Sequence, residues 1–109
     1  MNRYQALYEE RFVGNLKKYA SLRKRIKDKI AEILEAPYNR TERLGAIPHG
    51  INLSGCRSAR GGRNFRIIFV ACEECRKVEE CQYCFCEGRD DKTVVFLTVG
   101  PHQKAYAMR

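Results

Sequence analysis

Two stretches of sequence decide the fold: residues 64–71, Asn-Phe-Arg-Ile-Ile-Phe-Val-Ala, and residues 93–99, Thr-Val-Val-Phe-Leu-Thr-Val. In the first stretch Phe65, Ile67 and Phe69 form one apolar face, and Arg66 points to the other side. The second stretch is apolar on both faces, as is typical of a central strand. These patterns predict two long strands of one sheet.

Shorter strands are expected before this pair. Residues Tyr4–Tyr8 alternate weakly, and residues 57–60 precede a Gly61-Gly62 turn, so each segment predicts a short strand. The three later strands follow one another closely, so they should pair antiparallel. Residues 37–55 contain two prolines and three glycines and are expected to form a loop.

Two helices are predicted between the first strand and this loop. One runs from Glu9 to about Tyr19, and the other begins after Ser21, a candidate N-cap, and ends before Pro37. The second helix carries an apolar stripe of Leu22, Ile26, Ile30, Ile33 and Leu34. We therefore expect an α+β fold: a strand, a two-helix hairpin, then a three-stranded antiparallel sheet covered by helices on one face.

Length and composition limit the possible functions. The chain has 109 residues, and 44% hydrophobic residues with 31% charged residues are typical of a folded domain. No apolar run reaches the roughly 20 residues that cross a bilayer, and the start lacks a signal peptide. We expect one cytoplasmic domain over 1–109 with no membrane partner. A net charge of +8 predicts a polyanionic partner: nucleic acid, the ribosome or an acidic protein.

The charge is divided unevenly along the chain. Residues 72–91 carry seven acidic and three basic residues, a net charge of −4, so the remainder carries +12. The same segment holds five of the six cysteines. This composition indicates a distinct cysteine-rich module, inserted between the two long strands of a basic protein.

The cysteine spacing predicts a structural zinc site. Two Cys-x-x-Cys pairs occur close together, and this spacing lets both thiolates of a pair reach one ion. The expected ligands are Cys72, Cys75, Cys81 and Cys84, with Cys86 as a possible substitute for Cys84. Disulfides and free thiols are the alternatives, and disulfides are disfavoured by the missing export signal. Four thiolates leave no open coordination position, so no catalytic metal is expected, and Cys56 is interpreted as a small core residue.

Four arginines lie within ten residues: Arg57, Arg60, Arg63 and Arg66. Antiparallel pairing of the two long strands should bring Arg66 close to Gly100-Pro101-His102. Arginine binds phosphate bidentately, and histidine transfers protons near neutral pH. The alternative interpretation is a solvated basic face with no catalytic role.

No carboxylate occurs from Gly45 through Ala71, so this cluster lacks the ligands of a two-metal nuclease. If it cleaves RNA, the ribose 2′-OH should attack the adjacent phosphate without a metal, and arginines should stabilise the charge that develops. Lys104 and Tyr106 follow in the tail, where a tyrosine can stack on a base. Arg23 and Lys27, on the basic face of the second helix, are expected to contact RNA.

Three separated segments resemble the RelE/ParE toxin superfamily of toxin–antitoxin systems. They are Leu53–Val70 (LSGCRSARGGRNFRIIFV), Val94–Tyr106 (VVFLTVGPHQKAY), and the run from Ile33 to Tyr38 with the following Glu42–Gly45. The resemblance extends over nearly the whole chain except 72–91, which is no part of the common family pattern.

The resemblance to the RelE-like branch implies an endoribonuclease, an mRNA interferase that enters the ribosomal A site and cuts mRNA. It implies that Arg66 stabilises the transition-state phosphate, that Arg60 is a second basic catalytic position, that His102 is the general acid and that Tyr106 supports the substrate. It also implies a cognate antitoxin, which should bind as an extended acidic amphipathic segment. Ribosome and mRNA are the remaining expected partners, with no small-molecule substrate.

One departure from the family leaves the chemistry incomplete. Arg57 and Ser58 do not reproduce the lysine pair or the glutamate that members use as base, so no general base is assigned. Two other functions remain open: a non-catalytic ParE-like toxin that poisons DNA gyrase, and a zinc-stapled RNA-binding module without activity. His102 and Tyr106 count against the first, and the missing base favours the second.

Overall fold

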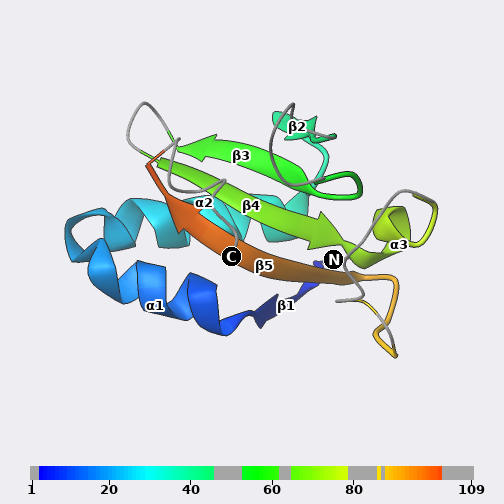
Figure 1. Ribbon diagram of the computed structural model, residues 1–109, viewed down its shortest axis with the longest axis horizontal. Helices are drawn as coiled ribbons and strands as arrows, with labels where there is room; N and C mark the ends of the chain where they lie inside the picture. The colour runs from blue at the N-terminus through cyan, green and yellow to red at the C-terminus, as the bar shows by residue number, and fades with distance from the viewer. Residues whose placement is uncertain (1–2, 46–52, 62–64, 79–85, 87, 102–109) are drawn as a thin grey trace.

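The computed structural model describes residues 3–45, 53–61, 65–78, 86 and 88–101. Figure 1 shows its elements in chain order: β1 (Gln5–Tyr8), α1 (Glu10–Lys18), the 3₁₀ turn η1 (Ala20–Leu22), α2 (Arg23–Glu35), β2 (Thr41–Arg43), β3 (Arg57–Gly61), β4 (Phe65–Ala71), α3 (Cys72–Cys75) and β5 (Thr93–Gly100).

The strands form one five-stranded sheet in the order β1-β5-β4-β3-β2. The antiparallel pairing of β3, β4 and β5 confirms the prediction. β1 adds to the edge of the sheet, parallel to β5, and β2 adds to the opposite edge, antiparallel to β3. The prediction that 37–55 is loop throughout is wrong at Thr41–Arg43, because a three-residue strand is too short to show a recognisable alternation.

The helices cover one face of the sheet, as expected. α2 buries Ile26, Ile30, Ile33 and Leu34 in a core that also contains Phe12 of α1 and apolar residues of β3, β4 and β5. α2 ends before Pro37 as predicted, but Ser21 is not its N-cap: Ser21 lies inside η1, and α2 begins at Arg23. No helix in the described ranges is long and apolar enough to cross a membrane.

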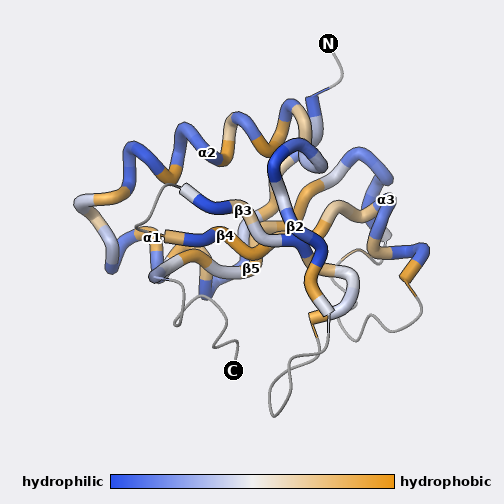
Figure 2. Tube along the Cα trace, turned by 90° about the horizontal axis from the view of Figure 1, so that it is seen from above, coloured by the Kyte–Doolittle hydropathy of each residue, from blue (hydrophilic) through white to orange (hydrophobic). Residues whose placement is uncertain are grey.

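The opposite face of the sheet carries a second core, which the sequence did not predict. Ile68 and Val70 of β4 and Val95 and Leu97 of β5 pack there, so both strands are buried on two sides over most of their length. In Figure 2 the helix α2 lies along one side of the strands, and α3 lies beyond their end. The remaining members of this core are Leu53 and four cysteines, Cys56, Cys72, Cys75 and Cys86.

The cysteines therefore form part of a packed core, and the zinc prediction needs correction. Cys72 forms a disulfide with Cys86, with their Cα atoms 5.3 Å apart. A sulfur in a disulfide is not a thiolate ligand, and within the described ranges no group of three or more His, Cys, Asp or Glu side chains could hold a metal. Cys81 and Cys84 lie outside the described residues. Cys56 is buried, as expected.

Candidate functional site

Arg66 lies at the start of β4, opposite Arg60 on β3 and Gly100 on β5. Its side chain is only 12% exposed. Nη1 donates to Ser58 Oγ at 3.4 Å and lies 3.9 Å from Glu42 Oε2. The guanidinium is thus held at the end of the sheet. The predicted proximity of Arg66 to Gly100 is confirmed.

Glu42 reaches this site because β2 extends the sheet. In the register of the strands Glu42 is opposite Ser58, and Ser58 is opposite Ile68. Directly opposed residues share a face, and alternation along β4 puts Arg66 on that same face. No carboxylate is expected in the arginine cluster from the sequence, because residues 37–55 are predicted to form a loop. The signal that the sequence does contain is the Glu42–Gly45 segment, which is part of the family resemblance.

Arg60 is exposed beside Arg66. Together with Gly61 and Phe65, it lines a surface depression of about 390 Å³ between the end of β3 and α2. The α2 residues along this depression are two cations and two carboxylates: Arg25, Lys29, Asp28 and Glu32. Arg66 does not line this depression, but Arg60 is directly opposite Arg66 in the strand register, which places an exposed basic residue next to Arg66.

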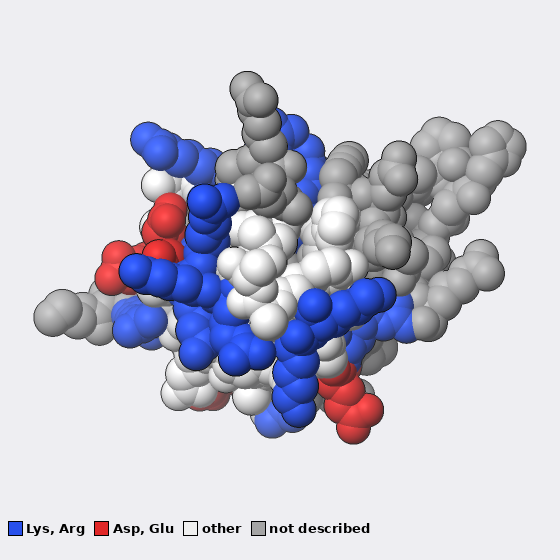
Figure 3. All heavy atoms as spheres, turned by 90° about the vertical axis from the view of Figure 1, so that its left-hand side faces the viewer, with Lys and Arg blue, Asp and Glu red and all other residues white. Residues whose placement is uncertain are grey.

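The surrounding surface is basic. Figure 3 views the end of the molecule where the α1–α2 turn, the end of β3 and the start of β4 come together, and Lys and Arg side chains gather across it. Arg23 and Lys27 are exposed on α2, as the sequence predicted. The other exposed cations of these helices are Lys17, Lys18, Lys24 and Arg25. A polyanion approaching Arg66 would encounter this surface.

Four of the site residues expected from the sequence, Arg63, His102, Lys104 and Tyr106, lie outside the described residues. Gly100 and Pro101, which immediately precede His102, are described, and Gly100 pairs with Arg66. The strand pairing therefore brings the beginning of the tail to the arginine pair.

Arg57 is engaged within the protein. Its Nε and Nη2 donate to the Glu74 carboxylate, each at 2.8 Å, and its Nη1 donates to Thr41 Oγ1 at 3.1 Å. The guanidinium also lies 4.7 Å from the centre of the Tyr38 ring, a cation–π contact. Of the predicted RNA-binding residues that are described, Arg57 is the one that already holds a carboxylate of α3.

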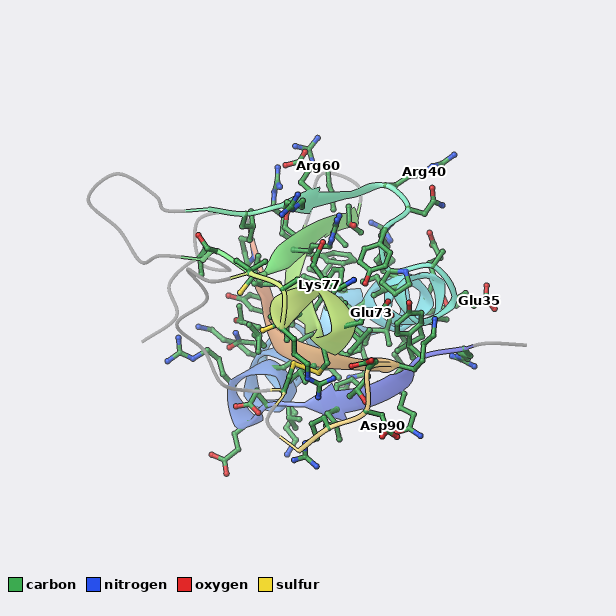
Figure 4. All side chains as sticks on the ribbon, turned by 90° about the vertical axis from the view of Figure 1, so that its right-hand side faces the viewer. Glu35, Arg40, Arg60, Glu73, Lys77 and Asp90 are labelled. Atoms are coloured by element: carbon green, nitrogen blue, oxygen red, sulfur yellow. A yellow bond between two sulfur atoms is a disulfide. The ribbon has the colours of Figure 1, made fainter. Side chains whose placement is uncertain are left out.

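A second polar cluster joins α3 to the sheet. Tyr38 OH donates to Glu73 Oε2 at 2.7 Å, Tyr4 OH donates to the same oxygen, and Lys92 Nζ donates to Tyr4 OH at 3.2 Å. Hydrogen bonds from Tyr4, then from Tyr38, lower the pKa of Glu73. Burial, then the bond to Glu73, raises the pKa of each tyrosine. Figure 4 shows Glu73 on α3 and Lys77 in the turn after α3 at this end of the molecule, with Asp90 below them in the view.

No protein-family model matches the chain, and no curated protein matches it. Two solved structures are similar in fold. A chain of the toxin–antitoxin complex RelBE2 from Mycobacterium tuberculosis superposes with a TM-score of 0.61 at 19% identity, covering 91% of this chain and 98% of that one. A mutant of the E. coli toxin RelE in the free state gives 0.59 at 18% identity, covering 97% and 93%.

These likenesses show the fold. The chain has a RelE-like α+β fold, in agreement with the resemblance that its sequence segments carry. Both comparisons span more than nine-tenths of this chain. The overall fold is thus shared with these two chains at low sequence identity.

Proposed function

We propose that this chain is the toxin of a toxin–antitoxin system and acts as a ribosome-dependent endoribonuclease on mRNA. The observation that carries the proposal is the shielded guanidinium of Arg66, held by Ser58 at the basic end of the sheet. The fold likeness to RelE toxins supports it. A guanidinium held in place before substrate arrives stabilises developing phosphate charge without reorganisation at the moment of reaction.

In this proposal Arg66 binds the scissile phosphate and Arg60 binds a non-bridging or neighbouring phosphate oxygen. The ribose 2′-OH attacks phosphorus, which needs no metal ion, and leaves a 2′,3′-cyclic phosphate and a 5′-hydroxyl. His102 is proposed as the acid for the leaving oxygen, and Tyr106 as a support for the substrate. Four further residues are proposed to contact RNA: Arg23, Lys27, Arg63 and Lys104. Arg57 is left out because its guanidinium is held by Glu74.

The proposed protein partner is a cognate antitoxin. The M. tuberculosis structure of similar fold is that of a toxin–antitoxin complex. An acidic, amphipathic antitoxin segment would complement the basic end of the sheet around Arg60 and Arg66. Occupancy of that surface would exclude RNA, and this would neutralise the toxin.

The test is to map mRNA 5′ ends in a translating extract after adding the wild-type protein, Arg66→Ala or Arg89→Ala. Arg89 is exposed in the acidic segment, so its variant removes the same charge away from the site. We expect cleavage in codon register with 5′-hydroxyl ends, lost in Arg66→Ala and kept in Arg89→Ala. Intact mRNA with arrested DNA supercoiling would favour a ParE-like toxin instead. Intact mRNA with RNA binding would favour a non-catalytic module.

A further inference from the structure

We propose that the hydroxyl of Tyr19, at the end of α1, binds the substrate RNA at the phosphate next to the one held by Arg66. This inference rests on the proposed function and adds to it a contact from the N-terminal helix. It is carried by the position of the Tyr19 ring beside Gly100, by the attachment of α1 to β5, and by the accessibility of the hydroxyl.

The ring of Tyr19 lies against Gly100 on the face of the sheet that Arg66 occupies. A Cβ built on Gly100 would be 3.3 Å from Cε2 of Tyr19 and 3.7 Å from its hydroxyl oxygen. Gly100 is directly opposite Arg66 in the register of β4 and β5, and directly opposed residues direct their side chains to the same face. Such opposed Cβ positions are about 4.5–5.5 Å apart. The phenol therefore belongs to the surroundings of Arg66.

The end of α1 reaches this position because it follows the edge of β5. β1 pairs only with residues 93–96 of β5, and α1 packs along the remainder of that strand. Asn15 Nδ2 donates to Thr98 Oγ1 at 2.9 Å. Four helical residues advance by about 6 Å and two strand residues by about 6.6 Å, so Tyr19 comes level with Gly100. The hydrogen bond of Asn15 thus fixes where the ring lies.

The hydroxyl of Tyr19 is open to a ligand. Tyr19 is half-buried, and its hydroxyl makes no hydrogen bond to any residue that the structure describes. No buried side-chain oxygen in the described part of the chain lacks a hydrogen-bond partner, so solvent reaches this one. Lys18 Nζ lies 5.7 Å from the centre of the ring. A phenol O–H beside an ammonium group is a donor suited to a phosphate oxygen.

The separation across the sheet decides which phosphate this donor meets. The guanidinium of Arg66 is directed toward β3, because its Nη1 donates to Ser58 Oγ, whereas Tyr19 lies over β5. β3 and β5 are the two neighbours of β4, so they are two strand spacings or about 9–10 Å apart. One phosphate would not reach both groups. The hydroxyl is placed for the next phosphate along the RNA, on the side away from Arg60 of β3.

Steady-state cleavage of mRNA on programmed ribosomes tests this contact with Tyr19→Phe, which removes the hydroxyl and keeps the ring against Gly100. Tyr8→Phe is the matched control, because Tyr8 is an exposed tyrosine on β1. We expect Tyr19→Phe to raise KM about tenfold, the effect of losing one hydrogen bond to a charged group, and the control to behave as wild type. The value of kcat should stay unchanged, because the bond to a neighbouring phosphate exists before and during the reaction.

Substrates that carry a methylphosphonate in place of one phosphate locate the contact, since a methyl group accepts no hydrogen bond. At one of the two phosphates next to the scissile one, this replacement should raise KM for wild type and for Tyr8→Phe. The increase should be much smaller for Tyr19→Phe, because this variant has already lost the same hydrogen bond.

The outcomes separate this contact from the proposed function. Wild-type cleavage with the same KM in Tyr19→Phe would overturn the contact and leave the nuclease proposal intact. Equal methylphosphonate effects in wild type and Tyr19→Phe would also overturn it, in favour of a structural role of the hydroxyl. Absence of cleavage by the wild type would overturn both.

Discussion

The carboxylate of Glu74 on α3 accepts hydrogen bonds from Nε and Nη2 of Arg57 on β3. The side chain of Glu74 is 16% exposed and that of Arg57 is 11% exposed. This pair joins the cysteine-rich segment to the sheet, at a distance of 17 residues along the chain. Tyr38 covers the guanidinium, and Thr41 Oγ1 accepts from Nη1. The acidic segment 72–91 is thus attached to the sheet through the carboxylate of its own Glu74.

Breaking this pair should destabilise the fold. We expect Glu74→Ala to lower the free energy of unfolding by about 3 kcal/mol, because it leaves a shielded guanidinium without its partner. Urea denaturation followed by circular dichroism measures the change. The double variant Arg57→Met/Glu74→Leu should lose less than the two single variants combined. Equal stability of Glu74→Ala and wild type would contradict the pairing.

The Glu73 cluster should give stability a defined pH dependence. Because folding lowers the pKa of Glu73, this group stabilises the folded state at pH values above its ordinary pKa of 4.5. The stabilisation is lost as the pH falls below that value. Because folding raises the pKa of Tyr4 and of Tyr38, the protonated tyrosines stabilise the folded state below their ordinary pKa of 10.0, and this stabilisation is lost as the pH rises beyond it. Unfolding free energies from pH 3 to 11 should form a plateau between these limits. Glu73→Gln should flatten the acidic side, and an unchanged acidic side would count against the cluster.

The Cys72–Cys86 disulfide should be directly detectable. Non-reducing digestion and mass spectrometry should yield a cross-linked peptide that contains both residues. Reduction of this bond should lower stability by about 3 kcal/mol, the value for a closed loop of this length. Sensitivity to a zinc chelator, with one bound zinc per chain and no cross-linked peptide, would restore the zinc prediction.

Substitution by alanine should have opposite effects on stability at two glycines, Gly61 and Gly14. A Cβ at Gly61 would overlap the ring of Phe65, which is buried in the helix-side core, so Gly61→Ala should cost about 1–3 kcal/mol. At Gly14, within α1, no atom lies within 4 Å of the added Cβ. Gly14→Ala should stabilise by about 0.5–1 kcal/mol. Thermal melts of both variants test the packing, and a neutral Gly61→Ala would contradict it.

The basic face of α2 should contribute affinity for RNA through electrostatics. The variant Arg23→Ala/Lys27→Ala should weaken binding to single-stranded RNA and reduce the slope of log affinity against log salt by about one for each lost phosphate contact. Arg89→Ala, which removes one charge from the acidic segment, should leave the slope unchanged. Identical slopes for the double variant and wild type would remove these residues from the interface.

Local patterns were sufficient to predict much of this architecture. The alternation in 64–71 and the apolar run in 93–99 predict interior strands, and the stripe from Ile26 to Leu34 predicts a helix packed on them. Antiparallel pairing then predicts the approach of Arg66 to Gly100, which lies 34 positions further along the chain. These predictions succeed because side-chain periodicity and burial are properties of short segments.

The sequence by itself determined the order of the two long helices and of four of the five strands, the basic character of the body and the placement of Arg66 beside the beginning of the tail. Only the tertiary structure decided that Glu42 joins Arg66, that Glu74 engages Arg57, and that Cys72 pairs with Cys86 inside a second core. Each of these contacts depends on an edge strand or a chain reversal with no periodicity of its own. The spacing of residues along the sequence limits which side chains can come into contact, and the packing of distant segments determines which of these contacts form.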